Sequence, residues 1–223
     1  MQKFELVIFG ASNMISDIIE CAIAHQITPK RVILDSPEPS GIRDIPIARR
    51  IEILNEHFNT TITLASLATF TPQANEIYIL GPTTPQREDL VRRINSTYQL
   101  QFHNLIHPTA YVSPMATFGQ GVFIGANSVL GTGVKFDDHV FINRGVTIGH
   151  DTHIGSYSRI QPGCNIGGLT RIGKSVSIGI GATIVDRITI GENSVIAAGS
   201  CVLSDIGTHQ LVAGSPATIK REI

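Results

Sequence analysis

The chain has 223 residues, of which 42% are hydrophobic and 16% charged, and its 17 basic and 18 acidic side chains give a formal net charge of −1. This composition describes a globular protein with ample material for a core, and without a Lys or Arg run it excludes an electrostatic footprint for nucleic acid or an anionic membrane. The N-terminal apolar run, Leu6 to Phe9, is far shorter than the ~18 residues of a membrane span. We therefore expect a cytoplasmic protein.

The three cysteines, Cys21, Cys164 and Cys201, lie far apart in the chain, and none belongs to a C-x-x-C pair. This spacing predicts neither a disulfide framework nor a zinc knuckle. We expect the three side chains to pack as small apolar groups.

The first hundred residues predict a small parallel α/β domain, about half of a Rossmann unit. Apolar runs at 6–9, 31–35 and 76–80 are typical of buried strands. A polar residue at 12–13 is expected to cap a helix after the first strand, and a second helix is expected to begin at 84–85 with proline in its first turn. The apolar faces of these two helices are Ile15, Ile18, Ile19 and Ala22, and Leu90, Val91 and Ile94. The segment between the second and third strands predicts no definite element.

The turn after the first strand is where a Rossmann-like unit binds a nucleotide. A dinucleotide fingerprint needs three glycines, whereas this turn has Gly10 followed by Ser12 and Ile15 at the other two positions, so a redox cofactor is not expected. The N–H groups at a helix start can still hold a phosphate, and Asp35 ends the second strand where an acidic residue often takes a ribose hydroxyl. The candidate substrate-binding residues here are Gly10, Ser12, Asn13 and Asp35. The competing interpretations are an ordinary strand-to-helix turn and a solvated strand end.

Glycine divides the chain, because only Gly10, Gly41 and Gly81 of the 21 glycines precede residue 105. This change of composition predicts a domain boundary near 100–108. We expect one domain at 1–104 and another at 105–223.

A period of six residues runs through the second part of the chain. From Ile106 to Val202 every sixth residue, the lead residue, is aliphatic or aromatic, for seventeen consecutive positions. The residue four places later is always Ala, Val, Ser, Thr, Cys or Ile, and nine of the residues directly after a lead are glycine. A period of six held over this length is typical of a hexapeptide parallel β-helix, in which stacked coils share one core of inward lead residues.

The stretch TIGHDTHIG at 147–155 places two histidines and an aspartate between two lead isoleucines. His150 and His153 are three residues apart, so on a strand they should face opposite sides and do not predict a shared metal site. Asp151 next to His150 is the kind of carboxylate that fixes the tautomer of a general base. Polar surface is the competing interpretation, and a carboxylate from another coil could serve in place of Asp151.

Four runs are distinctive: INRGVTIGHDTHIGSYSRIQPGCNIGG at 142–168, IGIGATI at 178–184, IAAGSCV at 196–202 and VAGSPA at 212–217. Together they resemble the hexapeptide-repeat acetyltransferases of the bacillosamine N-acetyltransferase and sialic acid O-acetyltransferase type. The N-terminal α/β unit and the IHPTA junction at 106–110 are similar as well, so the resemblance covers essentially the whole chain. It implies a left-handed parallel β-helix after a Rossmann-like domain, a homotrimer with active sites between neighbouring helices, acetyl-coenzyme A as donor, and no metal.

Members of this family acetylate an amino group on a nucleotide-linked sugar that the N-terminal domain partly holds. The resemblance therefore implies an acetyl-CoA-dependent N-acetyltransferase for a nucleotide-linked amino-sugar, a UDP-4-amino-4,6-dideoxy sugar being the leading candidate, in surface-glycan (lipopolysaccharide O-antigen) biosynthesis. Residues 1–104 would bind the nucleotide sugar, and 105–223 would carry out the transfer. The alternatives are a sialic acid-type O-acetyltransferase, a metal-dependent carbonic-anhydrase-like trimer and a nucleotide-sugar-binding scaffold.

Matched by motif, His150 would be the general base, Asp151 its carboxylate partner, and the Gly168 amide the donor to the thioester oxyanion. Asn143 would contact the acceptor. The coenzyme A groove would be lined by Arg159, Gly163, Gly181, Ala198, Gly214 and Pro216.

The chain departs from the family pattern in two places. Family members commonly have a histidine after the first turn, where this chain has Ser12, Asn13 and Met14, so the acceptor is expected to be held differently. Nine residues after the base, where many relatives have a second histidine, this chain has Arg159. Its guanidinium can pair with a phosphate of the coenzyme or the sugar, or it can be a surface arginine.

Overall fold

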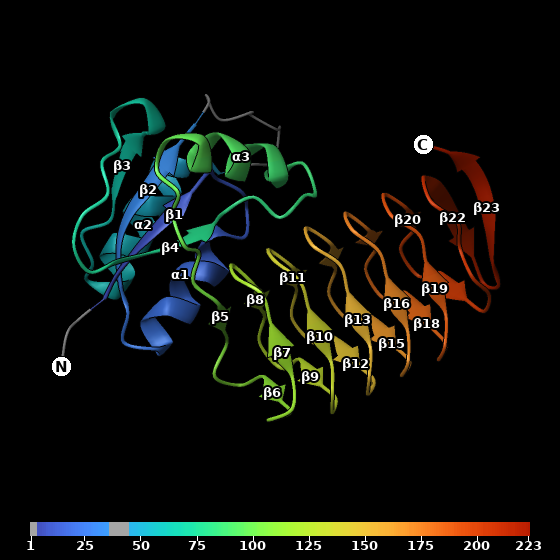
Figure 1. Ribbon diagram of the computed structural model, residues 1–223. Helices are drawn as coiled ribbons and strands as arrows, with labels where there is room; N and C mark the ends of the chain where they lie inside the picture. Colours follow the sequence, from blue (N-terminus) through green and yellow to red (C-terminus); the bar gives the residue numbers. More distant parts are fainter. Residues whose placement is uncertain (1–3, 36–44) are drawn as a thin grey trace. The chain divides into compact units, whose positions relative to one another are not determined.

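The computed structural model describes residues 4–35 and 45–223, which form two compact units (Figure 1). The first unit comprises the chain up to Thr83 together with Arg87–Leu105, and the second comprises Thr84–Gln86 together with Ile106–Ile223. Within the described residues, no helix combines the length and the apolar character that crossing a membrane requires.

The first unit is a parallel sheet connected by helices, as expected. Its four strands follow the order β3-β2-β1-β4, and β1 is apolar along most of its length because it lies between two neighbours in the sheet. The elements are β1 Glu5–Phe9, α1 Ile15–Ala24, β2 Thr28–Leu34, α2 Ile47–Phe58, β3 Thr63–Ser66, the 3₁₀ turn η1 Leu67–Thr69, β4 Glu76–Leu80 and α3 Arg87–Thr97.

The helix starts differ from the sequence-based expectation. The buried face of α1 is confirmed, but Met14 occupies its N-cap position and no side chain caps it, so the expectation that Ser12 or Asn13 does so is wrong. The hydroxyl of Ser12 instead donates to the Gly81 carbonyl at 2.6 Å and accepts from the Met14 N–H at 3.2 Å. This hydroxyl therefore ties the turn to the end of β4.

The segment without a sequence-based assignment contains α2 and β3. Helix α2 follows Pro46 without a capping side chain, which removes the usual start signal, and its buried face is Ile47, Ile51 and Leu54. The part of that segment at 36–44 lies outside the described residues. Helix α3 begins at Arg87, later than the predicted start at 84–85, while its predicted apolar face is buried.

The second unit is the expected solenoid, and every lead residue ends a two-residue strand. The strands are β5 Leu105–Ile106, β6 Tyr111–Val112, β7 Thr117–Phe118, β8 Phe123–Ile124, β9 Val129–Leu130, β10 Lys135–Phe136, β11 Phe141–Ile142, β12 Thr147–Ile148, β13 His153–Ile154, β14 Arg159–Ile160, β15 Asn165–Ile166, β16 Arg171–Ile172, β17 Ser177–Ile178, β18 Thr183–Ile184, β19 Thr189–Ile190, β20 Val195–Ile196 and β21 Cys201–Val202. They are followed by β22 Gln210–Gly214 and β23 Ala217–Glu222, an antiparallel pair.

Three faces result, because each strand from β5 to β18 pairs in parallel with the strand three places further along the chain, while β20 pairs with β22. The eight-stranded face has the order β23-β22-β20-β17-β14-β11-β8-β5, the six-stranded face β21-β18-β15-β12-β9-β6 and the five-stranded face β19-β16-β13-β10-β7. Lead residues stack on lead residues, as Ile148 does on Leu130 and Ile166. Figure 1 shows these coils stacked in chain order, and their lead residues form one buried core.

Small polar residues in the core are hydrogen-bonded to the next coil. The hydroxyl of Thr152 donates to the Gly167 carbonyl at 3.1 Å, and that of Ser158 to the Gly173 carbonyl at 2.8 Å. The Cys164 thiol donates to the Gly179 carbonyl in the same way. Because a buried donor without an acceptor is costly, these bonds explain why Ser, Thr and Cys can replace Ala and Val at this position.

The described cysteines are free thiols. Burial raises the pKa of Cys21 to about 12 and also raises the pKa of Cys164. These two pack as expected, whereas Cys201 is partly exposed on the six-stranded face.

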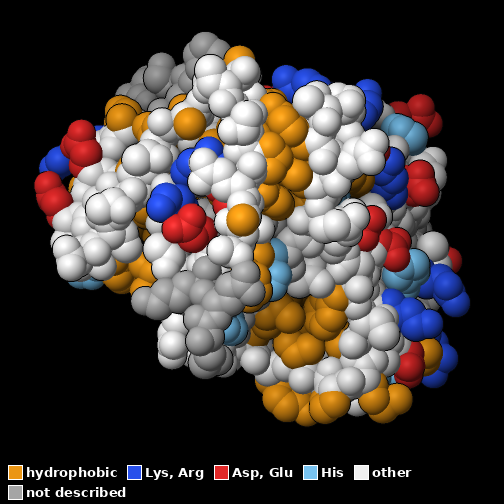
Figure 2. All heavy atoms as spheres, turned by 60° about the vertical axis from the view of Figure 1, so that its left-hand side comes forward, with side chains coloured by type: hydrophobic (Ala, Val, Ile, Leu, Met, Phe, Trp, Pro, Cys, Tyr) orange, Lys and Arg blue, Asp and Glu red, His pale blue; other side chains and the backbone are white. Residues whose placement is uncertain are grey.

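All three corners of the solenoid carry left-handed residues in columns, and two of these corners contain candidate site residues. One, the glycine corner, joins the eight-stranded to the six-stranded face and contains Gly145, Gly163, Gly181 and Gly199, with φ between 65° and 70°. The other, the His150 corner, joins the six-stranded to the five-stranded face, and its left-handed residues are Gly133, Asp151, Leu169 and Arg187. Figure 2 shows hydrophobic side chains gathered low in the view. Tyr111 and Met115, in the first coils, are among the exposed large hydrophobic residues.

Candidate active site

His150 and Asp151 form a hydrogen-bonded pair at the turn after β12. The imidazole Nδ1 lies 2.9 Å from the Asp151 carboxylate, and both side chains are more than half exposed. Asp151 has a left-handed backbone with φ of 56°, which lets the two adjacent side chains meet rather than project apart. With Nδ1 donating to the carboxylate, Nε2 is left as the basic nitrogen.

Gly168 lies one coil further along and directly beside the His150 ring. A Cβ built at this position would be 2.9 Å from both Cδ2 and Nε2 of His150, so only glycine leaves the ring its place. The neighbouring N–H groups of Gly167 and Leu169 donate to the carbonyls of Ile184 and His150, whereas the Gly168 N–H has no such acceptor within the described part of the chain. A base and an available amide donor therefore lie side by side.

The predicted coenzyme residues lie at the other edge of the six-stranded face. Gly163 and Gly181 belong to the glycine corner, and Ala198 directly precedes its last member. A Cβ added at either glycine would meet nothing within 4 Å, so the corner is an open strip of backbone. Asn143 lies at the same corner but is buried, with its oxygen accepting from the Arg144 N–H at 2.8 Å.

The turn between β22 and β23 continues this strip. Gly214 has a φ of 109°, and its N–H donates to the hydroxyl of Ser200, the residue that follows the glycine corner. Pro216 lies in the same turn, and the Ser215–Pro216 peptide bond is cis. The predicted Gly214 to Pro216 contribution thus lies next to Gly163, Gly181 and Ala198 on the fold.

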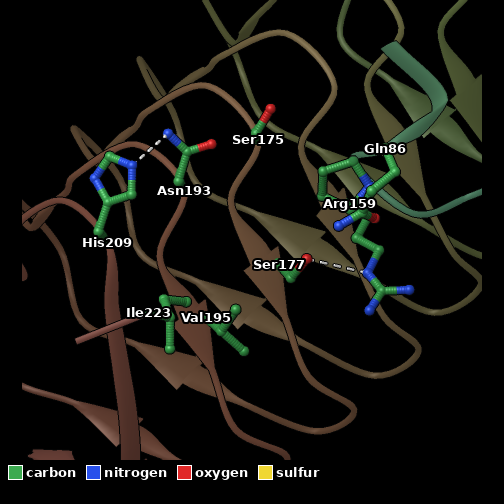
Figure 3. A pocket seen from close by; sticks show the side chains of 9 residues that line it. Gln86, Arg159, Ser175, Ser177, Asn193, Val195, His209 and Ile223 are labelled. Carbon is green, nitrogen blue, oxygen red and sulfur yellow. Dashed lines mark hydrogen bonds between the residues drawn. The ribbon is translucent and has the colours of Figure 1, made fainter. Parts of the chain in front are cut away.

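Arg159 lies apart from both groups, on the eight-stranded face. It begins β14 and lines a pocket of about 460 Å³ in the second unit (Figure 3). Its Nε donates to the Ser177 hydroxyl at 3.1 Å. The pocket is lined by Pro85, Gln86, Arg159, Ser175, Ser177, Asn193, Val195, His209 and Ile223.

His153 has a partner that sequence reasoning missed. Its Nε2 lies 2.9 Å from the carboxylate of Asp137, sixteen residues earlier in the chain. The coil repeat of eighteen residues could have suggested this neighbour, since His153 stacks directly on Lys135. Among the described residues, no group of three or more His, Cys, Asp and Glu side chains is arranged to hold a metal ion.

The candidate nucleotide contacts of the first unit are engaged within that unit. Gly10 has a φ of 74°, and a Cβ there would come within 2.7 Å of Pro82. The Asn13 side-chain oxygen accepts from Arg50 at 3.3 Å, and Asp35 forms an ion pair with Arg93. These contacts, with that of Ser12 described above, hold the turn and the strand end in place.

A family model described as bacterial transferase hexapeptide (six repeats) matches residues 169–204. No curated protein matches the chain.

Solved structures match it along nearly its whole length. The acetyltransferase domain of PglB from Neisseria gonorrhoeae, in complex with acetyl coenzyme A, is 25% identical with a TM-score of 0.78, and the match covers 97% of this chain and 99% of that one. A GDP-perosamine N-acetyl transferase from Caulobacter crescentus, in complex with CoA and GDP-perosamine, is 22% identical with a TM-score of 0.82 over 98% and 97%. WeeI from Acinetobacter baumannii is 16% identical, with a TM-score of 0.73 over 97% and 100%.

These matches confirm the predicted fold class, an N-terminal α/β unit followed by a left-handed β-helix of hexapeptide repeats. They also confirm the resemblance to the acetyltransferases of the bacillosamine type.

Proposed function

We propose that the protein is an acetyl-CoA-dependent N-acetyltransferase that acts on a nucleotide-linked amino-sugar. The single observation that carries this proposal is the His150–Asp151 pair packed against Gly168 on a hexapeptide solenoid. Whole-length similarity to acetyltransferases of this kind supports the enzyme class and acetyl-CoA as donor.

His150 would act as the general base. The acceptor amine must be uncharged to attack the thioester, and it loses a proton as the new C–N bond forms. Nε2 of His150 takes this proton, while Asp151 holds the Nδ1 proton and stabilises the imidazolium that results. An amine with a pKa near ~8 is already partly neutral at pH 7, so the base contributes less than it would for an alcohol.

The Gly168 N–H would stabilise the thioester oxygen as it becomes negative. This amide lies beside the base, and it has no carbonyl acceptor within the described residues. A donor that needs no reorganisation at the moment of reaction lowers the barrier most effectively. Coenzyme A leaves as a thiolate when the tetrahedral intermediate collapses, and the thiolate takes up the proton that Nε2 of His150 accepted from the amine, which restores the base.

The glycine corner would hold coenzyme A. Its open strip of backbone, with Gly163, Gly181 and Ala198 and the turn at Gly214 and Pro216, lets an extended thioester arm approach closely, because no side chain intervenes. Asn143 lies at the start of this strip and would orient the acceptor amine from there.

A homotrimer would complete the site. Five residues at about 3.3 Å each separate Gly163 at one corner from Gly168 at the other, so a single chain keeps the coenzyme strip and the base roughly 16 Å apart. A second copy whose glycine corner meets the His150 corner of the first would bring them together. The intervening six-stranded face suits such a contact, because its outward column is uncharged: Tyr111, Val129, Thr147, Asn165, Thr183 and Cys201.

The acceptor is proposed to be a UDP-4-amino-4,6-dideoxy sugar, with its nucleotide held by the first unit near Gly10, Ser12, Asn13 and Asp35. We also propose a cytoplasmic location and a role in surface-glycan (lipopolysaccharide O-antigen) biosynthesis, both of which follow from these substrates.

Thiol release from acetyl-CoA tests the proposal. We expect release with at least one member of a panel of UDP-, dTDP- and GDP-linked amino-sugars, and none with the matching sugars that carry a hydroxyl in place of the amine. Release with sialic acid instead would identify an O-acetyltransferase. No release with any acceptor would refute the proposed function.

A further inference from the structure

Among the described residues, Arg159 forms no ion pair with an acidic side chain. Its one contact within the described part of the chain is the Ser177 hydroxyl, which accepts from Nε and leaves the two terminal nitrogens available. Five other arginines in the described residues are paired with carboxylates, as Arg31 is with Glu76 and Arg187 with Asp186. Arg159 is therefore a guanidinium whose charge the fold itself does not neutralise.

This charge is also partly removed from water. Burial lowers the pKa of the Arg159 guanidinium from its ordinary value, and the accepting Ser177 hydroxyl is itself buried. Holding a cation in such a place without a counter-ion is unfavourable. A bound anion would offset that cost with charge-assisted hydrogen bonds to the planar guanidinium.

The rest of the pocket offers hydroxyl groups and further donors. Figure 3 shows Arg159 and Ser177 joined on neighbouring strands, with Asn193 and His209 joined at the adjoining turns. The Asn193 amide nitrogen lies 3.2 Å from His209 Nε2, and because an amide nitrogen only donates, the imidazole accepts there and carries its proton on Nδ1. None of the side chains that line this pocket is acidic.

The pockets on the five-stranded face differ in charge. Their cations lie among acids: Lys135 shares one pocket with Asp137 and Asp138, and Arg171 shares another with Glu192. An anion gains little there, because the carboxylates repel it. Of these three pockets in the described residues, the one at Arg159 is therefore the one that favours an anion.

We propose that the pocket around Arg159 binds a phosphate group of one of the two substrates, with the guanidinium as its main ligand and the Ser175 and Ser177 hydroxyls beside it. This inference rests on the proposed function for the identity of the ligand. The source is either coenzyme A or the nucleotide diphosphate, since both carry the same chemistry. The pocket volume of about 460 Å³ is large enough for a diphosphate.

Calorimetric titration of the full chain with inorganic pyrophosphate tests the pocket itself. Arg159→Gln removes the charge and keeps a side chain of similar length, and Arg171→Gln is the matched control, because both arginines directly precede a lead isoleucine on an outward face. We expect pyrophosphate to bind the wild type and Arg171→Gln alike, and Arg159→Gln at least about tenfold more weakly. Equal binding to all three proteins, or to none, would overturn the proposal, whether or not acetyl transfer is found.

Four further titrants identify the source of the phosphate. If Arg159→Gln weakens the binding of coenzyme A but not of dephospho-coenzyme A, the pocket holds the 3′-phosphate, and if it weakens both equally, the pocket holds the coenzyme diphosphate. If it weakens UDP but not uridine, the pocket holds the nucleotide diphosphate. Unchanged affinity for all four would overturn the assignment to a substrate.

Discussion

Two His–Asp pairs lie within one coil of each other, and they differ in which imidazole nitrogen is engaged. In both pairs nitrogen and carboxylate oxygen are 2.9 Å apart. His150 uses Nδ1 toward Asp151 and so presents Nε2, whereas His153 uses Nε2 toward Asp137. The distance alone does not distinguish a base from a surface ion pair; the nitrogen that is left free, and what lies beside it, must do so.

The surroundings of the two rings differ in the same sense. His150 lies at a corner where Gly168 clears the space next to Nε2 and supplies an amide. His153 lies in the outward column of the five-stranded face, stacked between Lys135 and Arg171. A reacting carbonyl can be placed between a base and a donor at the first pair, and the second pair offers no comparable arrangement.

The largest expected difference is in turnover. His150→Asn keeps the fold and removes the base, so kcat/KM for acetyl transfer should fall by about 10²-fold, the lower end of the usual range for a general base, because the acceptor is an amine. His153→Asn removes the same type of residue from the other pair and should change kcat/KM by less than about twofold. Thiol release with the active amino-sugar measures both. Equal losses in the two variants would mean that the choice of nitrogen does not matter.

A smaller effect is expected from displacing the His150 ring without removing it. Gly168→Ala places a methyl group 2.9 Å from Nε2 and keeps the N–H, so the ring must move while the amide donor remains. We expect about a tenfold loss of kcat, since small misplacements of a catalytic group are costly.

The matched control is Gly207→Ala, whose methyl group would meet the end of the Gln210 side chain at 3.1 Å, whereas at Gly168 the methyl group would lie 3.1 Å from the His150 carbonyl oxygen in addition to its ring contacts. A crystal structure of Gly168→Ala shows whether the His150 ring has moved. If the ring has moved and turnover is unchanged, His150 takes no part in the reaction.

Most of the solenoid was predictable because the same packing requirement recurs in every coil. One coil cannot bury its own lead residues, so a period of six from Ile106 to Val202 fixes strands, core and turns together. The first unit was predictable only where an apolar run or an apolar helix face marks the element in the sequence. Helix α2 has no capping residue, and the turn before α1 is held by a tertiary hydrogen bond, that of Ser12 to Gly81.

The pairings of charged and polar side chains could not be read from the sequence. Asp151 meets His150 only because its backbone is left-handed, and Asp137 meets His153 only because coils stack. The pocket at Arg159 combines residues from several coils with the 84–86 segment, and no single run of sequence contains that combination.

The smallest expected effect separates orientation from stability. Asp151→Asn and Asp137→Asn each remove one exposed carboxylate, so each should lower the free energy of unfolding by less than about 1 kcal/mol, measured by urea denaturation. Only Asp151→Asn should also slow acetyl transfer, because an amide in place of the carboxylate stabilises the imidazolium less. If the Asp151 carboxylate stabilises the imidazolium by less than about 1 kcal/mol, its loss lowers kcat by less than about fivefold. If Asp137→Asn slowed turnover as much as Asp151→Asn, the two pairs would belong to one network, and the choice of nitrogen would no longer separate base from ion pair.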